Sequence, residues 1–93
     1  MTKLKVRHFY KVNWYTKEEP QWGYFTVLAL DDKQIKIWEI NPWGGGPWVT
    51  TLRLNNEWSH SHINRAIEIP GLVGLMKILR RGNVKHKQRK IIT

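Results

Sequence analysis

The sequence predicts a mainly β protein, a small five-stranded antiparallel barrel followed by a C-terminal α-helix and a basic tail. Three observations predict it: an alternating N-terminal segment, two β-branched and aromatic runs joined by a polar turn, and helical spacing that begins after Pro70-Gly71. A chain of 93 residues has room for one core. We therefore expect residues 1–82 to form a single domain, with residues 83–93 as the basic tail.

Residues 3–15 alternate in polarity, which predicts one long strand or two strands with a bend. One parity of this segment is mostly apolar. The other parity carries the basic side chains Lys3, Lys5, Arg7 and Lys11. The segment therefore has one face suited to a core and one cationic face.

Residues 22–40 contain the clearest hairpin of the chain, because runs rich in β-branched and aromatic residues at 24–30 and 35–40 flank a polar turn. Gly23 indicates a bulge or a close backbone approach. Further strands are expected at 48–54 and 66–69. Residues 57–64 fit either a loop or a single helical turn.

Five short strands with a terminal helix are typical of small SH3-like or OB-like barrels. The strand-turn-strand pattern of residues 22–40 is similar to that of the small SH3-like barrels of chromatin-associated and ribosome-associated proteins. No residue motif assigns the chain to a family. Closure into a barrel would remove exposed strand edges that promote aggregation.

Helical spacing is confined to residues 72–81. Leu72, Leu75, Met76 and Leu79 recur at i, i+3, i+4 and i+7, which describes one apolar stripe. We expect this stripe to pack on the barrel. Gly82-Asn83 predicts the end of the helix, and the tail beyond it has no regular period, so we expect it to be mobile until it meets a partner.

The net charge of +9 is concentrated at the C-terminus. Seven of the 16 Lys and Arg residues lie after residue 76, and no Asp or Glu accompanies them. Such a block favours a polyanionic partner, nucleic acid first and an anionic membrane surface second. The alternative is a solvated tail that keeps the protein in solution.

Several features bear on the cellular compartment. The chain has no cysteine, which fits a reducing environment. No apolar run approaches the ~20 residues of a membrane span, and the first ten residues lack the apolar core of a signal peptide. We expect a cytoplasmic protein.

Motifs for catalysis or cofactor binding are weak, so we predict no enzyme activity and no cofactor. The acidic residues fall mostly in adjacent pairs within predicted turns, which does not suit acid–base chemistry. On a strand, His60 and His62 would share one face and could hold a metal, but no third ligand is specified. The neighbouring serines lack the context of a hydrolase, and the glycines before Pro47 lack the lysine of a phosphate-binding loop.

The segment NPWGGGPW at residues 41–48 places two of the six tryptophans around a triple glycine. A core this small cannot hide all the aromatic side chains of the chain. Trp43 and Trp48 are therefore candidates for stacking against unpaired bases, for anchoring a protein partner, or for folding back as a lid over the barrel.

The sequence favours a non-catalytic protein that binds DNA or RNA with little sequence preference, since no recognition-helix pattern stands out. Its alternative is a small interaction module, an accessory or inhibitory subunit that docks on a larger protein through the Trp-Gly loop and the basic tail. The predicted nucleic-acid contacts are Lys3, Lys5, Arg7, Lys11, Trp43, Trp48, Arg53, Arg80, Arg81, Lys85, Lys87, Arg89 and Lys90.

Overall fold

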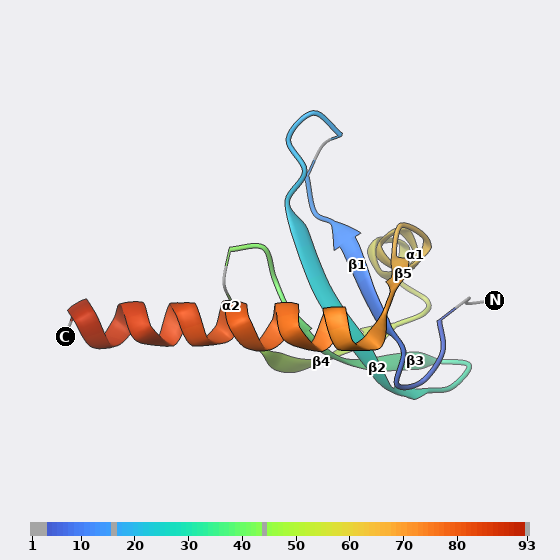
Figure 1. The fold of residues 1–93 in the computed structure, drawn as a ribbon. Helices are drawn as coiled ribbons and strands as arrows, with labels where there is room; N and C mark the ends of the chain where they lie inside the picture. Colours follow the sequence, from blue (N-terminus) through green and yellow to red (C-terminus); the bar gives the residue numbers. More distant parts are fainter. Residues whose placement is uncertain (1–3, 16, 44, 93) are drawn as a thin grey trace.

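The computed structural model describes residues 4–15, 17–43 and 45–92, without the side chains of Trp58, His60, His62 and residues 83–92. Five strands and two helices follow one another along the chain (Figure 1). Their bounds are β1 (Phe9–Asn13), β2 (Trp22–Leu30), β3 (Gln34–Ile40), β4 (Trp48–Arg53), α1 (Glu57–Asn64), β5 (Ile67–Ile69) and α2 (Gly71–Ile92).

The strands form one antiparallel sheet in the order β4-β3-β2-β1-β5. The mainly β class, the five antiparallel strands and the C-terminal helix are thus confirmed. Within the described ranges, β4 and β5 are the two edges and no ladder joins them, so the sheet is not closed. Closure into a barrel stays a prediction.

The hairpin predicted at residues 22–40 is confirmed, with β2 and β3 paired from Tyr24–Ile40 to Leu30–Ile35. A bulge between Val27 and Ala29 interrupts the register, and bulges bend a strand and increase its twist. Residues 57–64 form the helix α1, which is the helical alternative for this segment.

The alternating N-terminal segment bends instead of forming one strand. Arg7 has a φ of 70°, a left-handed conformation that breaks the alternation. Its N–H donates to the carbonyl of Val27 at 2.8 Å, and Val6 forms a parallel bridge with the same residue. Regular pairing starts at Phe9, so Lys5 and Arg7 lie outside the strand.

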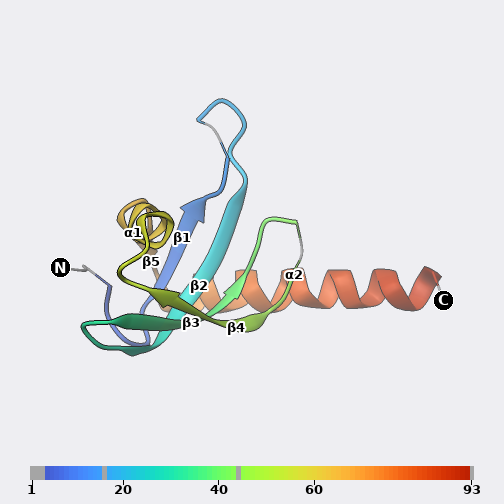
Figure 2. The same cartoon turned by 180° about the vertical axis from the view of Figure 1, so that it is seen from behind.

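The two faces of the sheet bury different clusters. The inner face, on which Phe25 and Ile37 lie, is covered by α1 and Leu4; the outer face, on which Tyr24 and Ile40 lie, is covered by α2 (Figures 1 and 2). The buried inner cluster consists of Leu4, Tyr10, Val12, Phe25, Val27, Ile35, Ile37, Leu52 and Ile63. The outer cluster consists of Tyr24, Ile40 and Ile78, with Phe9, Trp22, Trp38 and Ile69 packed around it.

Helix α2 contacts the sheet through a face different from the predicted one. Ile78 is completely buried, and a Cβ at Gly74 would lie 2.5 Å from the Cβ of Phe9, so only glycine fits this contact. The predicted stripe points to solvent, with Leu72 72% exposed. The prediction was wrong because one small residue and one isoleucine, not the leucines, fit against the aromatic outer face.

The predicted helix end at residue 81 is also wrong, since α2 continues through Gly82 and Asn83 to Ile92. Its second half extends beyond the sheet (Figure 1). Among the described residues, no helix is long and apolar enough to cross a membrane.

Candidate functional site

The loop of residues 41–47, here called the glycine loop, folds tightly around Asn41. The Asn41 side-chain oxygen accepts hydrogen bonds from the backbone N–H groups of Trp43 at 3.1 Å and Gly45 at 2.7 Å. The backbone N–H of Asn41 donates to the Gly45 carbonyl at 3.0 Å. Gly46 has a φ of 105°, where other residues are strained, and precedes a cis peptide bond to Pro47. Gly45 and Gly46 therefore allow a compact turn around the Asn41 side chain.

The two tryptophans of this segment remain largely in contact with solvent. Trp43 is 62% exposed and Trp48 is 49% exposed. Trp43 meets Trp14 edge to face, with ring centroids 6.0 Å apart, and the Trp14 indole lies directly against Gly23. This contact explains Gly23 as a close approach, and it leaves most of the Trp43 ring free of the core.

Helix α2 passes the base of the glycine loop. The Arg81 Nη1 atom donates to the Trp22 carbonyl at 2.6 Å and to the Asn41 carbonyl at 3.4 Å. A Cβ at Gly82 would lie 2.9 Å from the Cδ of Pro47, so the helix and the loop are in contact. The second half of α2, which is basic in sequence, therefore leaves the sheet beside the glycine loop (Figure 2).

Three cations lie over two aromatic rings of β2 at the same place. The Lys11 Nζ atom is 4.5 Å from the Trp22 ring centroid. Lys77 and Arg81 approach the Tyr24 ring at 6.0 and 5.2 Å. Such contacts stabilise a cation next to a ring face. We call Lys11, Trp22, Tyr24, Lys77 and Arg81 the cation–aromatic cluster.

Charged side chains are divided between the two faces of the sheet. By the pairing register, Lys11, Lys36 and Arg53 lie on the outer face, and Glu39 and Glu68 lie on the inner face. In the described strands, the outer face has no carboxylate to neutralise its cations. The charged side chains that the strands place on the outer face are therefore all basic.

Some of the predicted contact residues do not join this cluster. Arg7 and Gly71 line a pocket at the start of α2. Gly71 precedes Arg81 by ten residues of the helix, which correspond to about 15 Å along its axis. Arg53 pairs with Gln34 at the end of β4 away from Trp48. The Lys5 N–H donates to the Tyr10 hydroxyl at 2.8 Å.

Arg80 is exposed on α2, next to the cluster residue Arg81. Lys85, Lys87, Arg89 and Lys90 lie on the helical backbone of α2, but their side chains are outside the described part of the chain. Lys3 lies outside the described residues altogether.

Lys77, Trp22 and Tyr24 were missing from the predicted site. The spacing of Lys77 and Arg81 by four residues, one helical turn, is the signal that would have paired them. Trp22 and Tyr24 gave no such signal, because a strand pattern does not tell which aromatic residues a distant helix will reach. Asn41 was missed as the organiser of the glycine loop.

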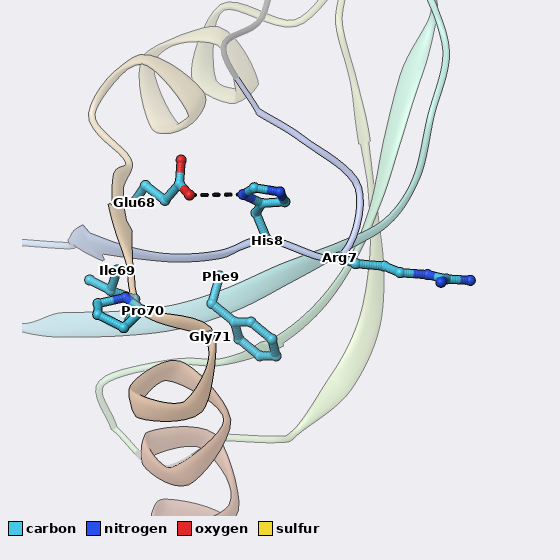
Figure 3. Close-up of a pocket in the computed structure, with 7 residues that line it drawn as sticks. All are labelled: Arg7, His8, Phe9, Glu68, Ile69, Pro70 and Gly71. Carbon is cyan, nitrogen blue, oxygen red and sulfur yellow. Dashed lines mark hydrogen bonds and ion pairs between the residues drawn. The ribbon is translucent and has the colours of Figure 1, made fainter.

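A second polar feature lies where β5 meets the start of β1. His8 Nδ1 and Glu68 Oε2 are 2.8 Å apart. They line an open pocket with Phe9 and Pro70, while Arg7 points away from the pair (Figure 3). The pair links the segment before β1 to the short edge strand β5.

A metal site is not formed by the described residues, among which no three His, Asp or Glu side chains gather. The side chains of His60 and His62 lie outside the described residues. Their backbone positions are in the helix α1, not in a strand. The strand alternation that would place both on one face is therefore wrong, because residues two apart in a helix are about 200° apart around its axis.

No protein-family model, curated protein or solved structure matches this chain. Its function must therefore be inferred from its own residues and their arrangement.

Proposed function

We propose that this protein binds nucleic acid without catalysing a reaction, and that it does so with little sequence preference. The observation that carries the proposal is the meeting of α2 with the glycine loop, where Arg81 reaches the backbone of Asn41 and Gly82 contacts Pro47. Arg81 and Gly82 are thereby held at the base of the loop that carries Trp43 and leads into Trp48.

Two kinds of contact follow from this arrangement. Lys11 and Lys77, held over aromatic rings, and the basic residues of α2 would neutralise phosphates and release counterions. Trp43, more than half exposed, would stack on an unpaired base, a contact worth about 1–3 kcal/mol. Because both the phosphate contacts and the stacking tolerate any base, the expected binding depends on salt far more than on sequence.

The fold is compatible with this function. We propose that the sheet is an open form of the SH3-like barrel. Support comes from the order β4-β3-β2-β1-β5 and from the short helix α1 that precedes the returning strand β5. The bulge in β2 gives the sheet the bend that such a barrel needs. A curved sheet of this kind would leave the glycine loop and the second half of α2, which extends beyond the sheet, open to a partner.

The test is a fluorescence-anisotropy titration of short labelled single-stranded and double-stranded oligonucleotides between about 50 and 300 mM salt. The wild-type affinity should fall steeply with salt. The double variant Lys11→Gln/Lys77→Gln should lower the slope of log affinity against log salt by about 1–2. Trp43→Ala should weaken single-stranded binding by about 1–3 kcal/mol and leave the salt slope unchanged.

A matched control removes two cations at the far end of the sheet. Lys33→Gln/Arg53→Gln loses the same charge, but Arg53 pairs with Gln34 away from the glycine loop. Binding that is insensitive to salt, or equally weakened by both double variants, would contradict the proposed site. Loss of a protein partner with unchanged oligonucleotide affinity in Trp43→Ala would favour the interaction-module alternative.

A further inference from the structure

The side of α2 that faces away from the sheet carries an unusual amount of exposed apolar surface. Its side chains fall within two turns and are all more than a third exposed. They are Leu72, Val73, Leu75, Met76 and Leu79, here called the apolar stripe. Contiguous apolar patches on soluble proteins mark surfaces that are covered by something else.

The charged residues that neighbour the apolar stripe in the sequence of α2 are all basic. From residue 69 to residue 93 the sequence contains no Asp or Glu, and seven Lys and Arg residues. Arg80 follows directly after the stripe and is exposed. The helical backbone then continues without interruption through the basic residues 85–90. A surface that is both apolar and anionic would complement the stripe and the basic residues that follow it.

The position of α2 is compatible with contact along its whole length. The helix lies on one side of the sheet, opposite to α1, and extends past the sheet at its C-terminal end (Figures 1 and 2). The contacts with Phe9 and Ile40 are made through Gly74 and Ile78. The opposite side of the helix is thus open to a flat surface.

We propose that α2 docks this protein on an anionic phospholipid membrane surface. The helix lies parallel to the surface, with the apolar stripe inserted at the level of the upper acyl chains and the basic residues on the lipid headgroups. Helices that combine an apolar face with Lys and Arg bind lipid interfaces in this way. The binding is peripheral and reversible, and no segment crosses the bilayer.

Charge and polarity favour lipid over other occupants. In a pair of α2 helices from two copies, each stripe would meet a segment that also lacks any carboxylate, so like charges would repel each other. Nucleic acid supplies the negative charge but no apolar surface for Leu72 and Met76. An anionic bilayer supplies both the negative charge and the apolar surface. This proposal does not depend on nucleic-acid binding.

The test compares flotation of the full chain with vesicles of phosphatidylcholine and of an equimolar phosphatidylcholine–phosphatidylglycerol mixture. We expect binding to the anionic vesicles at least about tenfold tighter than to the neutral ones. The variant Leu72→Gln/Leu79→Gln should weaken anionic binding by about tenfold, because it removes apolar insertion but no charge. Glutamine is a good helix former, so α2 should persist.

The matched control is Leu28→Gln/Val49→Gln, which replaces two exposed apolar residues of the strands and should bind vesicles like the wild type. No binding to the anionic vesicles, or unchanged binding by Leu72→Gln/Leu79→Gln, would overturn the proposal. So would a wild-type dimer in light scattering that this variant dissociates. Oligonucleotide affinity, measured in parallel, should be the same in both variants, so failure of one proposal is distinguishable from failure of the other.

Discussion

The inner and outer faces of the sheet are built from the same strands but packed in different ways. On the inner face, aliphatic side chains such as Val27, Ile35 and Ile37 are completely buried and are enclosed by α1 and the N-terminal segment. On the outer face, aromatic rings surround one isoleucine of α2, Ile78. The inner face resembles a conventional core, whereas the outer face is a docking surface for a single helix.

The two faces also differ in their charged side chains. Glu39 and Glu68 lie on the inner side, where Glu39 accepts the Thr50 hydroxyl at 2.6 Å and Glu68 pairs with His8. The cations over aromatic rings lie on the outer side. The carboxylates of the strands thus form contacts within the fold on the inner side, whereas the cations of the cation–aromatic cluster lie on the outer side.

The largest expected effect contrasts one buried isoleucine from each face. Ile37→Ala should lower the free energy of unfolding by about 2–5 kcal/mol, because the enclosed inner core cannot collapse around the cavity. Ile78→Ala should cost nearer the lower end of that range, because α2 can shift to fill the space. Urea denaturation followed by tryptophan fluorescence and by circular dichroism measures both losses.

The same measurement can contradict this distinction between the inner and outer faces. If Ile78→Ala destabilises the protein as much as Ile37→Ala, and helix and sheet signals are lost together in both variants, the two faces form one cooperative core. A separate early loss of helical signal in Ile78→Ala would instead sharpen the distinction.

Local patterns in the sequence were sufficient to predict most of the sheet. The hairpin at residues 22–40 has strong β propensity on both sides of a polar turn, and both features act within a few residues. The bend at Arg7 was harder to place, because it depends on hydrogen bonding to Val27, twenty residues away in the sequence. Alternation in sequence does not reveal such a partner.

The docking face of α2 could not be predicted from its own sequence. Its most apolar stripe is the usual guide to a packed face, yet the helix packs through Gly74 and Ile78 because Phe9 leaves no room for a Cβ at position 74. For a related reason, the sequence could not tell which of the predicted contact residues would lie close together. Arg81 reaches the glycine loop, whereas Arg7 and Arg53 are carried elsewhere by the bend before β1 and by the direction of β4.

An intermediate effect is expected at the glycine that lets α2 approach the sheet. Gly74→Ala should improve helix propensity by about 1 kcal/mol but place a methyl group 2.5 Å from the Phe9 Cβ. Overpacking of this kind costs about 1–3 kcal/mol, so we expect a net loss of about 1 kcal/mol in thermal or urea denaturation.

Gly71→Ala is the matched control for that variant. A Cβ at Gly71 would meet Phe9 at 3.6 Å, an ordinary contact distance, so this change should be neutral or slightly stabilising. Equal stability of the two variants would show that α2 is not seated tightly on Phe9, and the outer face would then be looser than the comparison assumes.

The smallest expected effect concerns the turn between β2 and β3. The side chains of these two strands line both faces of the sheet. The Asp31 carboxylate accepts the N–H groups of Lys33 at 2.7 Å and Gln34 at 2.8 Å, and these bonds lower the pKa of Asp31. A lowered folded-state pKa means that the turn's contribution to stability is present above about pH 4 and is lost as the pH falls through the folded-state pKa.

Asp31→Asn keeps a side-chain oxygen for both N–H groups but removes the charge. The variant should therefore show a flatter decline of the urea midpoint between about pH 5 and pH 2 than the wild type does. Near pH 7 the two midpoints should differ slightly, since the group is exposed. If the acid decline is identical in the two proteins, the hydrogen bonds of the Asp31 carboxylate add no measurable stability to the turn. The hairpin that both faces share would then be held by strand pairing and side-chain packing instead of by its turn.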